Sequence, residues 1–250
     1  MGTRVGTGFA LVLALLLTVA TTGYFGLTGT SDVFGTYRQI GDVTMLVQDI
    51  DRDFVGMRRN VAEFARSGDQ EALSRVQEIR RSIAENLKKA TEAITDPGRR
   101  QAVAQLSAPI EQYGANFDQI IQKRAERDRQ VNEQMNPVGA KLRTNLTEVI
   151  KTAMAESDFV TAAQAGMSQE ALMLARLNAN RFLSTPDAAL VKTANEQIDT
   201  LVASLDRLKQ SAKSPEQQAR IRQMAEGAPQ YKVAFASAVK AINERNLLVN

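Results

Sequence analysis

The chain has 250 residues and contains neither cysteine nor histidine. These two absences exclude thiolate and imidazole metal ligands, a cysteine nucleophile and every general base that works through imidazole. No convergent acid and base pair and no other nucleophile site is visible in the sequence, so we expect no enzyme, no metal site and no cofactor. The absence of cysteine is also compatible with an oxidising periplasm.

Tryptophan is absent too, aromatic residues make up only 5% of the chain, and there are six prolines. Alanine, glutamine, glutamate, arginine and leucine dominate instead, a composition typical of long helices and helical bundles, so an all-α fold is expected. The 31 basic residues are offset by 28 acidic ones, for a net charge of +3. This differs from the one-sided basic face of nucleic-acid-binding proteins, so no nucleic-acid partner is expected.

A long apolar run occupies residues 5–27, directly after Arg4. As a helix it spans roughly 34 Å, enough to cross a bilayer. The alternative is a cleaved signal peptide with its apolar region at 9–20, but no clean small-x-small cleavage site follows and the run is longer than such a region. We therefore predict an anchor at 1–30 in the inner (cytoplasmic) membrane. Arg4 favours a cytoplasmic N-terminus, which places residues 31–250 in the periplasm.

The chain contains an internal repeat. The segment 105–132 recurs at 223–250, an offset of 118 residues, and the same offset holds upstream without a gap. Over 58–132, 15 of 75 positions are identical to their counterparts, where about five are expected by chance. The repeated residues include Arg58, Tyr113 and Arg127, whose counterparts are Arg176, Tyr231 and Arg245. The sequence therefore predicts a duplicated helical unit.

Apolar residues at alternating spacings of three and four predict bundle-forming helices. Six are expected, at residues 40–64, 73–94, 103–155, 172–182, 191–208 and 215–250.

Several residues mark the ends and joints of these helices. Asp69 follows a Ser-Gly stop and is expected to cap the second helix. Pro109 is expected to bend the third helix. Pro137 and Gly139 interrupt its apolar stripe, and we interpret them as a kink between two modules rather than as a hairpin. The chain is expected to turn at Ala165-Gly166.

This order of helices predicts two stacked four-helix bundles that share the long third and sixth helices. The membrane-proximal module covers about residues 31–135 and the distal module about residues 136–250. The counterpart of residues 133–166 would follow Asn250, so the last helix is expected to be truncated. The missing part would complete the proximal bundle and lead to a second transmembrane helix.

Several stretches of the chain resemble a known family: FVGMRRNVAEFARSGD, ALMLARLNANRFLSTPD and ERNLLVN. These stretches lie on a duplicated helical scaffold that follows one expected transmembrane helix. Together, these features resemble the helical bimodular sensor domain of bacterial methyl-accepting chemotaxis proteins and some sensor histidine kinases. The likeness covers nearly all of the chain after residue 30. It implies an extracytoplasmic sensor of small carboxylates, such as acetate and tricarboxylic-acid-cycle intermediates, with a site in each bundle.

The resemblance also implies which arginines bind the ligand, namely Arg58 and Arg176 on the first helix of each module. The best-known members of the family have a second arginine about one turn further on. This chain has other residues there, which leaves the identity of the ligand open, especially in the first module. The residues at those positions are Asn60 or Val61 in the first module and Asn180 or Arg181 in the second.

Both arginines directly follow an apolar seam residue, so they lie on the flank of the bundle core. From there a guanidinium can grip a carboxylate bidentately. The alternative for Arg58 and Arg176 is a structural salt bridge or a solvated side chain. Recurrence of arginine at the same place in both modules favours binding.

Arg127 and Arg245 occupy core-facing positions of their seams. A buried cation needs a counter-charge, because it otherwise costs several kcal/mol. Either a ligand or an acid on a neighbouring helix, such as Asp51 or Asp53, would supply it.

Tyr113 and Tyr231 lie at seam spacing and are expected in the core. Because a buried phenol needs a hydrogen-bond partner, the alternative places them at a pocket wall. The candidate ligand-binding residues are Arg58, Arg176, Asn178, Arg181, Arg127, Arg245, Tyr113 and Tyr231.

Small side chains favour the distal module as the ligand site. Ala175 and Ala179 leave more room than the larger Met57 and Val61 at the equivalent positions of the first module. The nearby Asn178 and Arg181, named above, would add polar contacts.

Two hypotheses follow. The first is a chemoreceptor sensor that binds a small organic acid, forms a symmetric homodimer, and signals by shifts of about 1–2 Å between its first and sixth helices. Its cytoplasmic signalling domain would couple to a histidine kinase. The alternatives are a membrane-anchored structural or adaptor bundle without a ligand, and the sensor region of a histidine kinase.

Overall fold

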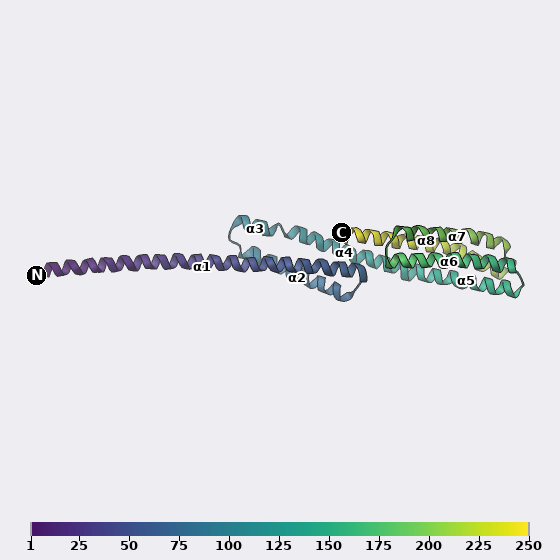
Figure 1. Cartoon of the computed structure of the whole chain (residues 1–250), viewed down its shortest axis with the longest axis horizontal. Helices are drawn as coiled ribbons and strands as arrows, with labels where there is room; N and C mark the ends of the chain where they lie inside the picture. Colours follow the sequence, from purple (N-terminus) through teal and green to yellow (C-terminus); the bar gives the residue numbers. More distant parts are fainter. Residues whose placement is uncertain (1, 250) are drawn as a thin grey trace. The chain divides into compact units, whose positions relative to one another are not determined.

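The structure, a computed structural model, describes the backbone of residues 2–249 and the side chains of residues 16–22, 35 and 37–249. Every regular element between residues 2 and 249 is a helix, which confirms the all-α expectation (Figure 1). In chain order the elements are α1 (Gly2–Ser67), α2 (Gln70–Ala93), α3 (Pro97–Ala104), α4 (Ser107–Arg129), the π-helical η1 (Gln130–Met135), α5 (Asn136–Ala155), α6 (Phe159–Ser184), α7 (Ala188–Ser211) and α8 (Pro215–Val249).

The apolar run at 5–27 belongs to α1. The side chains of residues 5–15 and 23–27 lie outside the described part of the chain, so the membrane span stays a prediction. Among the residues that are described, no helix combines the length and apolar character that crossing a bilayer requires.

Helix ends follow the offset found in the sequence. α2 and α7 both have 24 residues, and their starts and ends are 118 residues apart. α3 and α8 begin at Pro97 and Pro215, again 118 residues apart. Asp69 and Asp187 cap α2 and α7 alike, because each carboxylate accepts a hydrogen bond from the backbone N–H two residues later, at 3.1 and 2.9 Å. The expected cap at Asp69 is confirmed, and the repeat extends to the helix boundaries.

Pro109 breaks the expected third helix instead of bending it. α3 ends at Ala104 and α4 begins at Ser107, so Pro109 falls in the first turn of a new helix. A proline ring conflicts with the carbonyl four residues earlier, here that of Gln105. The first helical turn tolerates proline because its N–H groups have no helical partner.

Pro137 does not turn the chain back. Helix continues from α4 through η1 into α5 and ends at Ala155, as the sequence predicted. The π-helical η1 ends at Met135, two residues before Pro137, and this change of pitch accommodates a residue that cannot donate to the i−4 carbonyl.

The turn expected at Ala165 and Gly166 is wrong, because both residues lie inside α6. The chain turns before α6, where Ser157 has a positive φ of 56°. Asp158 then caps α6 by accepting a hydrogen bond from the Thr161 N–H at 3.2 Å. A single glycine costs a helix about 1 kcal/mol and does not end it without such a cap or turn nearby.

The chain divides into two compact units. Unit 1 comprises Met1–Phe64 and Asp69–Gly114, and unit 2 comprises Ala65–Gly68 and Ala115–Asn250. Each unit is described separately below.

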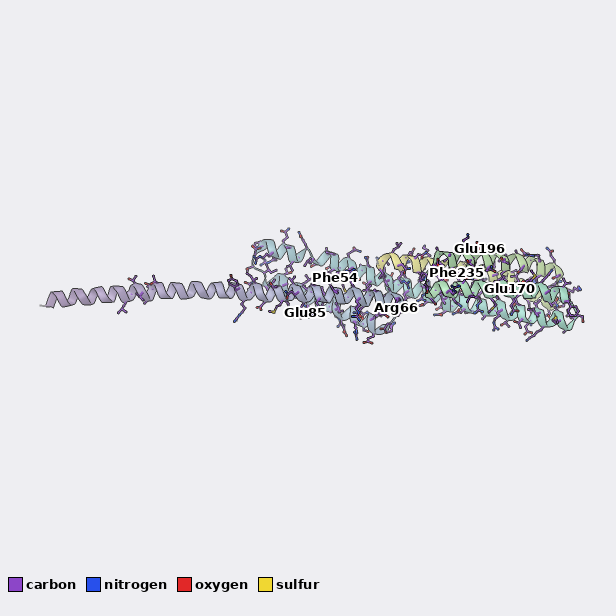
Figure 2. The ribbon with its side chains drawn as sticks, viewed as in Figure 1. Phe54, Arg66, Glu85, Glu170, Glu196 and Phe235 are labelled. Atoms are coloured by element: carbon purple, nitrogen blue, oxygen red, sulfur yellow. The ribbon has the colours of Figure 1, made fainter. Side chains whose placement is uncertain are left out.

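In unit 2, the four helices α5 to α8 form a bundle around one core. α5 packs on α6 and α8, and α7 packs on the same two helices (Figure 1). Phe235, labelled in Figure 2, lies in this core. Its ring meets that of Phe182 edge to face, with centroids 6.0 Å apart. Both side chains are almost completely buried.

Unit 1 contains α2, α3 and parts of α1 and α4. Met57 of α1 is fully buried, and Ser82 of α2 donates a 2.8 Å hydrogen bond to Asp53 of α1. Ile40, the first expected seam residue, is 42% exposed and lines a groove of about 590 Å³ between α1 and α3. The fourth helix that would complete this bundle stays a prediction.

Candidate functional site

Arg176 and Tyr231 meet in unit 2, on helices α6 and α8. Tyr231 is 3% exposed, and burial raises the pKa of its hydroxyl to about 12, while the charge of Arg176 opposes that rise. A methyl group built at Gly139 of α5 would lie 3.2 Å from both Arg176 Nε and Tyr231 Cε2. Three helices therefore converge here, and the missing side chain at Gly139 leaves room for the guanidinium and the ring.

Arg58 and Tyr113 repeat this pair in unit 1, on α1 and α4. Burial raises the pKa of the Tyr113 hydroxyl, and the charge of Arg58 again opposes the rise. Phe54, one turn before Arg58 on α1, contacts the Tyr113 ring edge to face, with centroids 5.3 Å apart. Arg58 is exposed and Tyr113 half-buried, so this pair is more open to solvent than its counterpart.

Neither arginine of these pairs has a carboxylate partner within the described part of the chain, and neither tyrosine hydroxyl makes a hydrogen bond there. The salt bridge weighed as an alternative for Arg58 and Arg176 thus does not form among these residues. A guanidinium beside a neutral phenol offers hydrogen-bond donors and a positive charge without a counter-ion. That combination is the complement of a carboxylate.

The other two distal candidates do not converge with Arg176. Asn178 donates from Nδ2 to the carbonyl four residues earlier at 2.9 Å, and Asn60 makes the equivalent bond in unit 1 at 2.8 Å. At about 100° per residue, Asn178 lies about 200° and Arg181 about 140° from Arg176 around α6. Arg181 is exposed in the last turn of that helix. One ligand on Arg176 would therefore not also contact both residues.

Arg127 and Arg245, both expected at core-facing positions, lie near each other in unit 2. Arg127 Nε lies 2.9 Å from Asp128 Oδ1, and the Arg127 side chain is 17% exposed. The carboxylate that contacts Arg127 is thus that of the next residue, Asp128. Asp53, considered above as a partner of Arg127, instead accepts a hydrogen bond from Ser82 of α2. Burial, followed by the charges of Arg127 and Arg124, lowers the pKa of Arg245.

Sequence reasoning missed the role of Arg124. Its guanidinium donates to the carbonyls of Ala65 at 3.2 Å and Ser67 at 2.6 Å, at the C-terminal end of α1. The helix dipole favours a cation there. Gly68 has a φ of 77°, and a side chain at this position would overlap the guanidinium. The Ser-Gly stop indicated the end of the helix, but no local signal identified a capping group 57 residues away.

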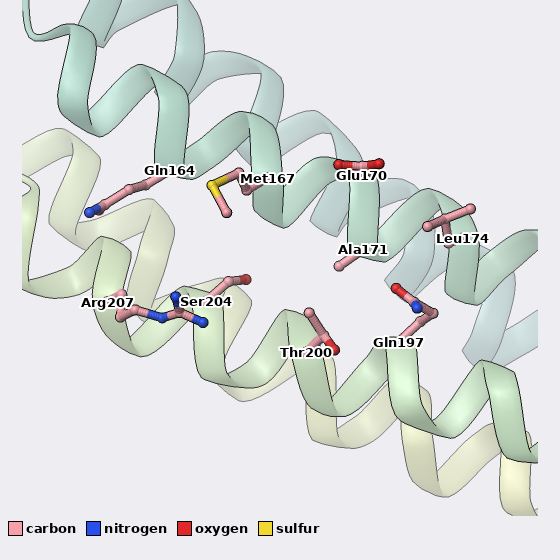
Figure 3. Close-up of a pocket in the computed structure, with 9 residues that line it drawn as sticks. All are labelled: Gln164, Met167, Glu170, Ala171, Leu174, Gln197, Thr200, Ser204 and Arg207. Atoms are coloured by element: carbon pink, nitrogen blue, oxygen red, sulfur yellow. The ribbon is translucent and has the colours of Figure 1, made fainter.

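A groove of about 340 Å³ lies between α6 and α7 of unit 2. Met167 and Glu170 line it from α6, and Ser204 and Arg207 line it from α7 (Figure 3). It has one acidic and one basic side chain in an otherwise neutral lining, so it carries no excess charge for an anion.

A smaller cavity of about 110 Å³ lies between α5 and α8, beside Asn145 and Gly227. Neither this cavity nor the groove is lined by Arg176 or Tyr231. Ala175 is fully buried in the packed core, as is Ala179, so the room expected there is not an open cavity.

Comparison with models of known protein families finds no match to this chain, and a search of curated proteins finds none either. The functional assignment therefore rests on the sequence pattern and on the geometry of the two arginine–tyrosine pairs.

Proposed function

We propose that the chain is the extracytoplasmic ligand-sensing part of a transmembrane chemoreceptor and that it binds small organic anions, carboxylates above all. The observation that carries the proposal is the arginine–tyrosine pair, which occurs in both units at the same 118-residue offset. In neither pair does an acid among the described residues neutralise the arginine.

The ligand carboxylate accepts hydrogen bonds from the guanidinium of Arg176 and from the hydroxyl of Tyr231. This phenol is protonated at neutral pH, and burial raises its pKa still further, so its hydroxyl acts as a donor. The low local polarity around the ring strengthens the pairing of guanidinium and carboxylate. Arg58 and Tyr113 bind in the same way, but more weakly, because solvent screens the more exposed pair.

Signalling follows from where Arg176 lies. Its guanidinium packs against α5 at Gly139, so a carboxylate that draws it away changes the contact between α5 and α6. Small shifts between packed helices are sufficient for helix-displacement switches. In the proposed receptor, a membrane anchor, a second bundle around unit 1 and a symmetric dimer carry this shift to a cytoplasmic domain that controls a histidine kinase.

A thermal-shift screen of organic acids against the full chain in detergent tests this proposal. Stabilisation by one or more acids, reduced in the Arg176→Ala variant, supports it, because a ligand that binds only the folded state raises Tm. Absence of stabilisation by every acid favours the alternative of a membrane-anchored structural bundle. That alternative draws support from the groove and the smaller cavity described above for unit 2, because Arg176 lines neither of them.

A further inference from the structure

The groove between α6 and α7 of unit 2 carries two opposite charges that do not pair with each other. Glu170 of α6 and Arg207 of α7 both line it (Figure 3). Glu170 makes no hydrogen bond or ion pair with any residue that the structure describes, and Arg207 has no carboxylate partner among those residues. Arg207 Nε contacts only the carbonyl of Ala203, four residues earlier on its own helix, at 3.5 Å. The groove therefore presents a carboxylate and a guanidinium without counter-charges among the described residues.

One end of the groove offers hydrogen-bond donors. Figure 3 shows Gln164 and Arg207 together at this end. Ser211 donates to Gln164 Oε1 at 2.6 Å, whereas Gln164 Nε2 makes no hydrogen bond within the described part of the chain. The N–H groups of this amide and of the guanidinium are therefore available to a carboxylate, which accepts charge-assisted hydrogen bonds.

Further along α6 the lining accepts hydrogen bonds instead. Glu170 lies there, across the groove from Thr200 of α7 (Figure 3). Thr200 Oγ1 donates its proton to the Glu196 carbonyl at 2.8 Å, so the lone pairs of this oxygen stay available. A carboxylate and a hydroxyl oxygen are the complement of an ammonium group, which only donates hydrogen bonds.

The rest of this α6 lining is largely apolar. Ala171 is buried, and Met167 and Leu174 expose apolar surface beside it. The volume of about 340 Å³ falls in the range of roughly 300–1,000 Å³ that is typical of small-molecule sites. An apolar group of a ligand would be stabilised here, because it removes this surface from water.

The equivalent positions of unit 1, 118 residues earlier, satisfy one another. Arg52, the counterpart of Glu170, lies 3.0 Å from Asp49 and 3.7 Å from Asp53. Ser82, the counterpart of Thr200, donates a 2.8 Å hydrogen bond to the same Asp53. The repeated fold therefore does not require unpaired charges on this face, and their presence in unit 2 points to a role other than helix packing.

We propose that the groove between α6 and α7 binds a zwitterionic amino acid with an apolar side chain. The carboxylate of the ligand accepts hydrogen bonds from Arg207 and from Gln164 Nε2. Its ammonium group donates to Glu170 and to Thr200 Oγ1, and its side chain packs against the apolar lining of α6.

The balance of charge in the groove selects for a ligand that carries both charges. The lining contains one acid and one base, so an ion with a single charge leaves either Glu170 or Arg207 unmatched. Neither Arg176 nor Tyr231 lines the groove, so the inference stands independently of the proposed carboxylate site.

Titration calorimetry of the full chain in detergent with L-leucine tests the inference. We expect saturable binding that Glu170→Gln and Arg207→Gln each weaken about tenfold or more, because each variant loses one charge-assisted contact. Both side chains are exposed, so without ligand the variants should keep the Tm of the unaltered chain. Asp206→Asn and Arg181→Gln, at exposed positions outside the groove, are the matched controls and should bind leucine as the unaltered chain does.

Analogues of leucine supply a second readout. 4-Methylpentanoate keeps the carboxylate and the branched chain, whereas isoamylamine keeps the ammonium group and the branched chain. Both are compared with leucine in the Arg58→Gln/Arg176→Gln double variant, so that carboxylate binding at the arginine–tyrosine pairs does not contribute. Each analogue should bind at least about tenfold more weakly than leucine. Glycine should also bind more weakly, because it has no side chain to cover the apolar lining.

The inference is overturned if leucine does not bind, if Glu170→Gln and Arg207→Gln bind it as the controls do, or if either analogue binds as tightly as leucine. The Arg58→Gln/Arg176→Gln double variant separates this outcome from the fate of the proposed sensor. Leucine binding at the groove should survive in that variant, whereas binding of organic acids at the arginine–tyrosine pairs should not.

Discussion

Arg176 lies beside the buried ring of Tyr231, and its charge opposes the rise in the pKa of that hydroxyl. The two residues come from α6 and α8, and the pair of Arg58 and Tyr113 reproduces the relationship 118 residues earlier. Because the same two residue types meet in both copies of the duplicated unit, the pairing does not depend on the local sequence of one helix. It is a property of the repeated fold.

The first prediction concerns stability at alkaline pH. The Tyr231 hydroxyl ionises near pH 10 in the unfolded chain and near pH 12 in the folded one, so the unfolded chain binds fewer protons between these values. The contribution of this hydroxyl to the free energy of unfolding is therefore fully present below pH 10. It is lost as the pH rises towards 12, which lowers the free energy of unfolding by roughly 2–3 kcal/mol. The free energy of unfolding of Tyr231→Phe, measured with urea, should not show this part of the decrease with pH. An equal decrease in the variant and in the unaltered chain would contradict the prediction.

The second prediction concerns Gly139. A helical Gly→Ala substitution in open space gains about 1 kcal/mol. Gly166 of α6 has such space, because no atom lies within 4 Å of where its Cβ would stand, so Gly166→Ala should show this gain. Gly139→Ala should gain less or lose stability, because the methyl group crowds Arg176 and Tyr231. It should also weaken carboxylate binding about tenfold by displacing the guanidinium. Equal gains in thermal unfolding of the two variants would refute the close packing at Gly139.

The third prediction concerns the core of unit 2. Phe235→Ala should cost about 3–5 kcal/mol in urea unfolding, because the ring is fully buried. A double-mutant cycle with Phe182→Ala should give a coupling of about 1 kcal/mol for the edge-to-face contact. Leu247→Ala is the control, since this side chain is 79% exposed, and it should change stability by less than about 0.5 kcal/mol. Equal costs for Leu247→Ala and Phe235→Ala would show that the packing of this core is wrong.

The fourth prediction concerns the end of α1. Arg124→Gln removes the hydrogen bonds to the carbonyls of Ala65 and Ser67 and should cost about 1–3 kcal/mol. Hydrogen exchange should accelerate in the last turn of α1, while Arg129→Gln leaves it unchanged. Unaltered exchange in both variants would mean that Arg124 does not cap the helix.

The sequence predicted those parts of the fold that local patterns control. Seam spacing and caps such as Asp69 identified the helices and most of their ends, and Pro215 marked the start of α8. The turn at Ala165-Gly166 was wrong because small residues are compatible with a helix interior. The real turn depends on Ser157 and Asp158, whose conformations are not apparent from an apolar pattern.

The candidate site was predictable only as far as the repeat reaches. The repeat identified the arginines and tyrosines that meet as pairs, because residues at equivalent positions of the two copies are expected to have similar surroundings. It also identified Arg127 and Arg245, but not that these two residues lie near each other in unit 2. The contacts of Arg124 and Gly139 join residues far apart in the sequence, and helical periodicity carries no information about such contacts.

Titration calorimetry with acetate and succinate, on the full chain in detergent, tests the central claim most directly. The account predicts measurable binding of at least one acid, weakened about tenfold or more by Arg176→Gln and Tyr231→Phe and unchanged by Arg181→Gln. Absence of binding, or equal affinities in Arg176→Gln and Arg181→Gln, would contradict it.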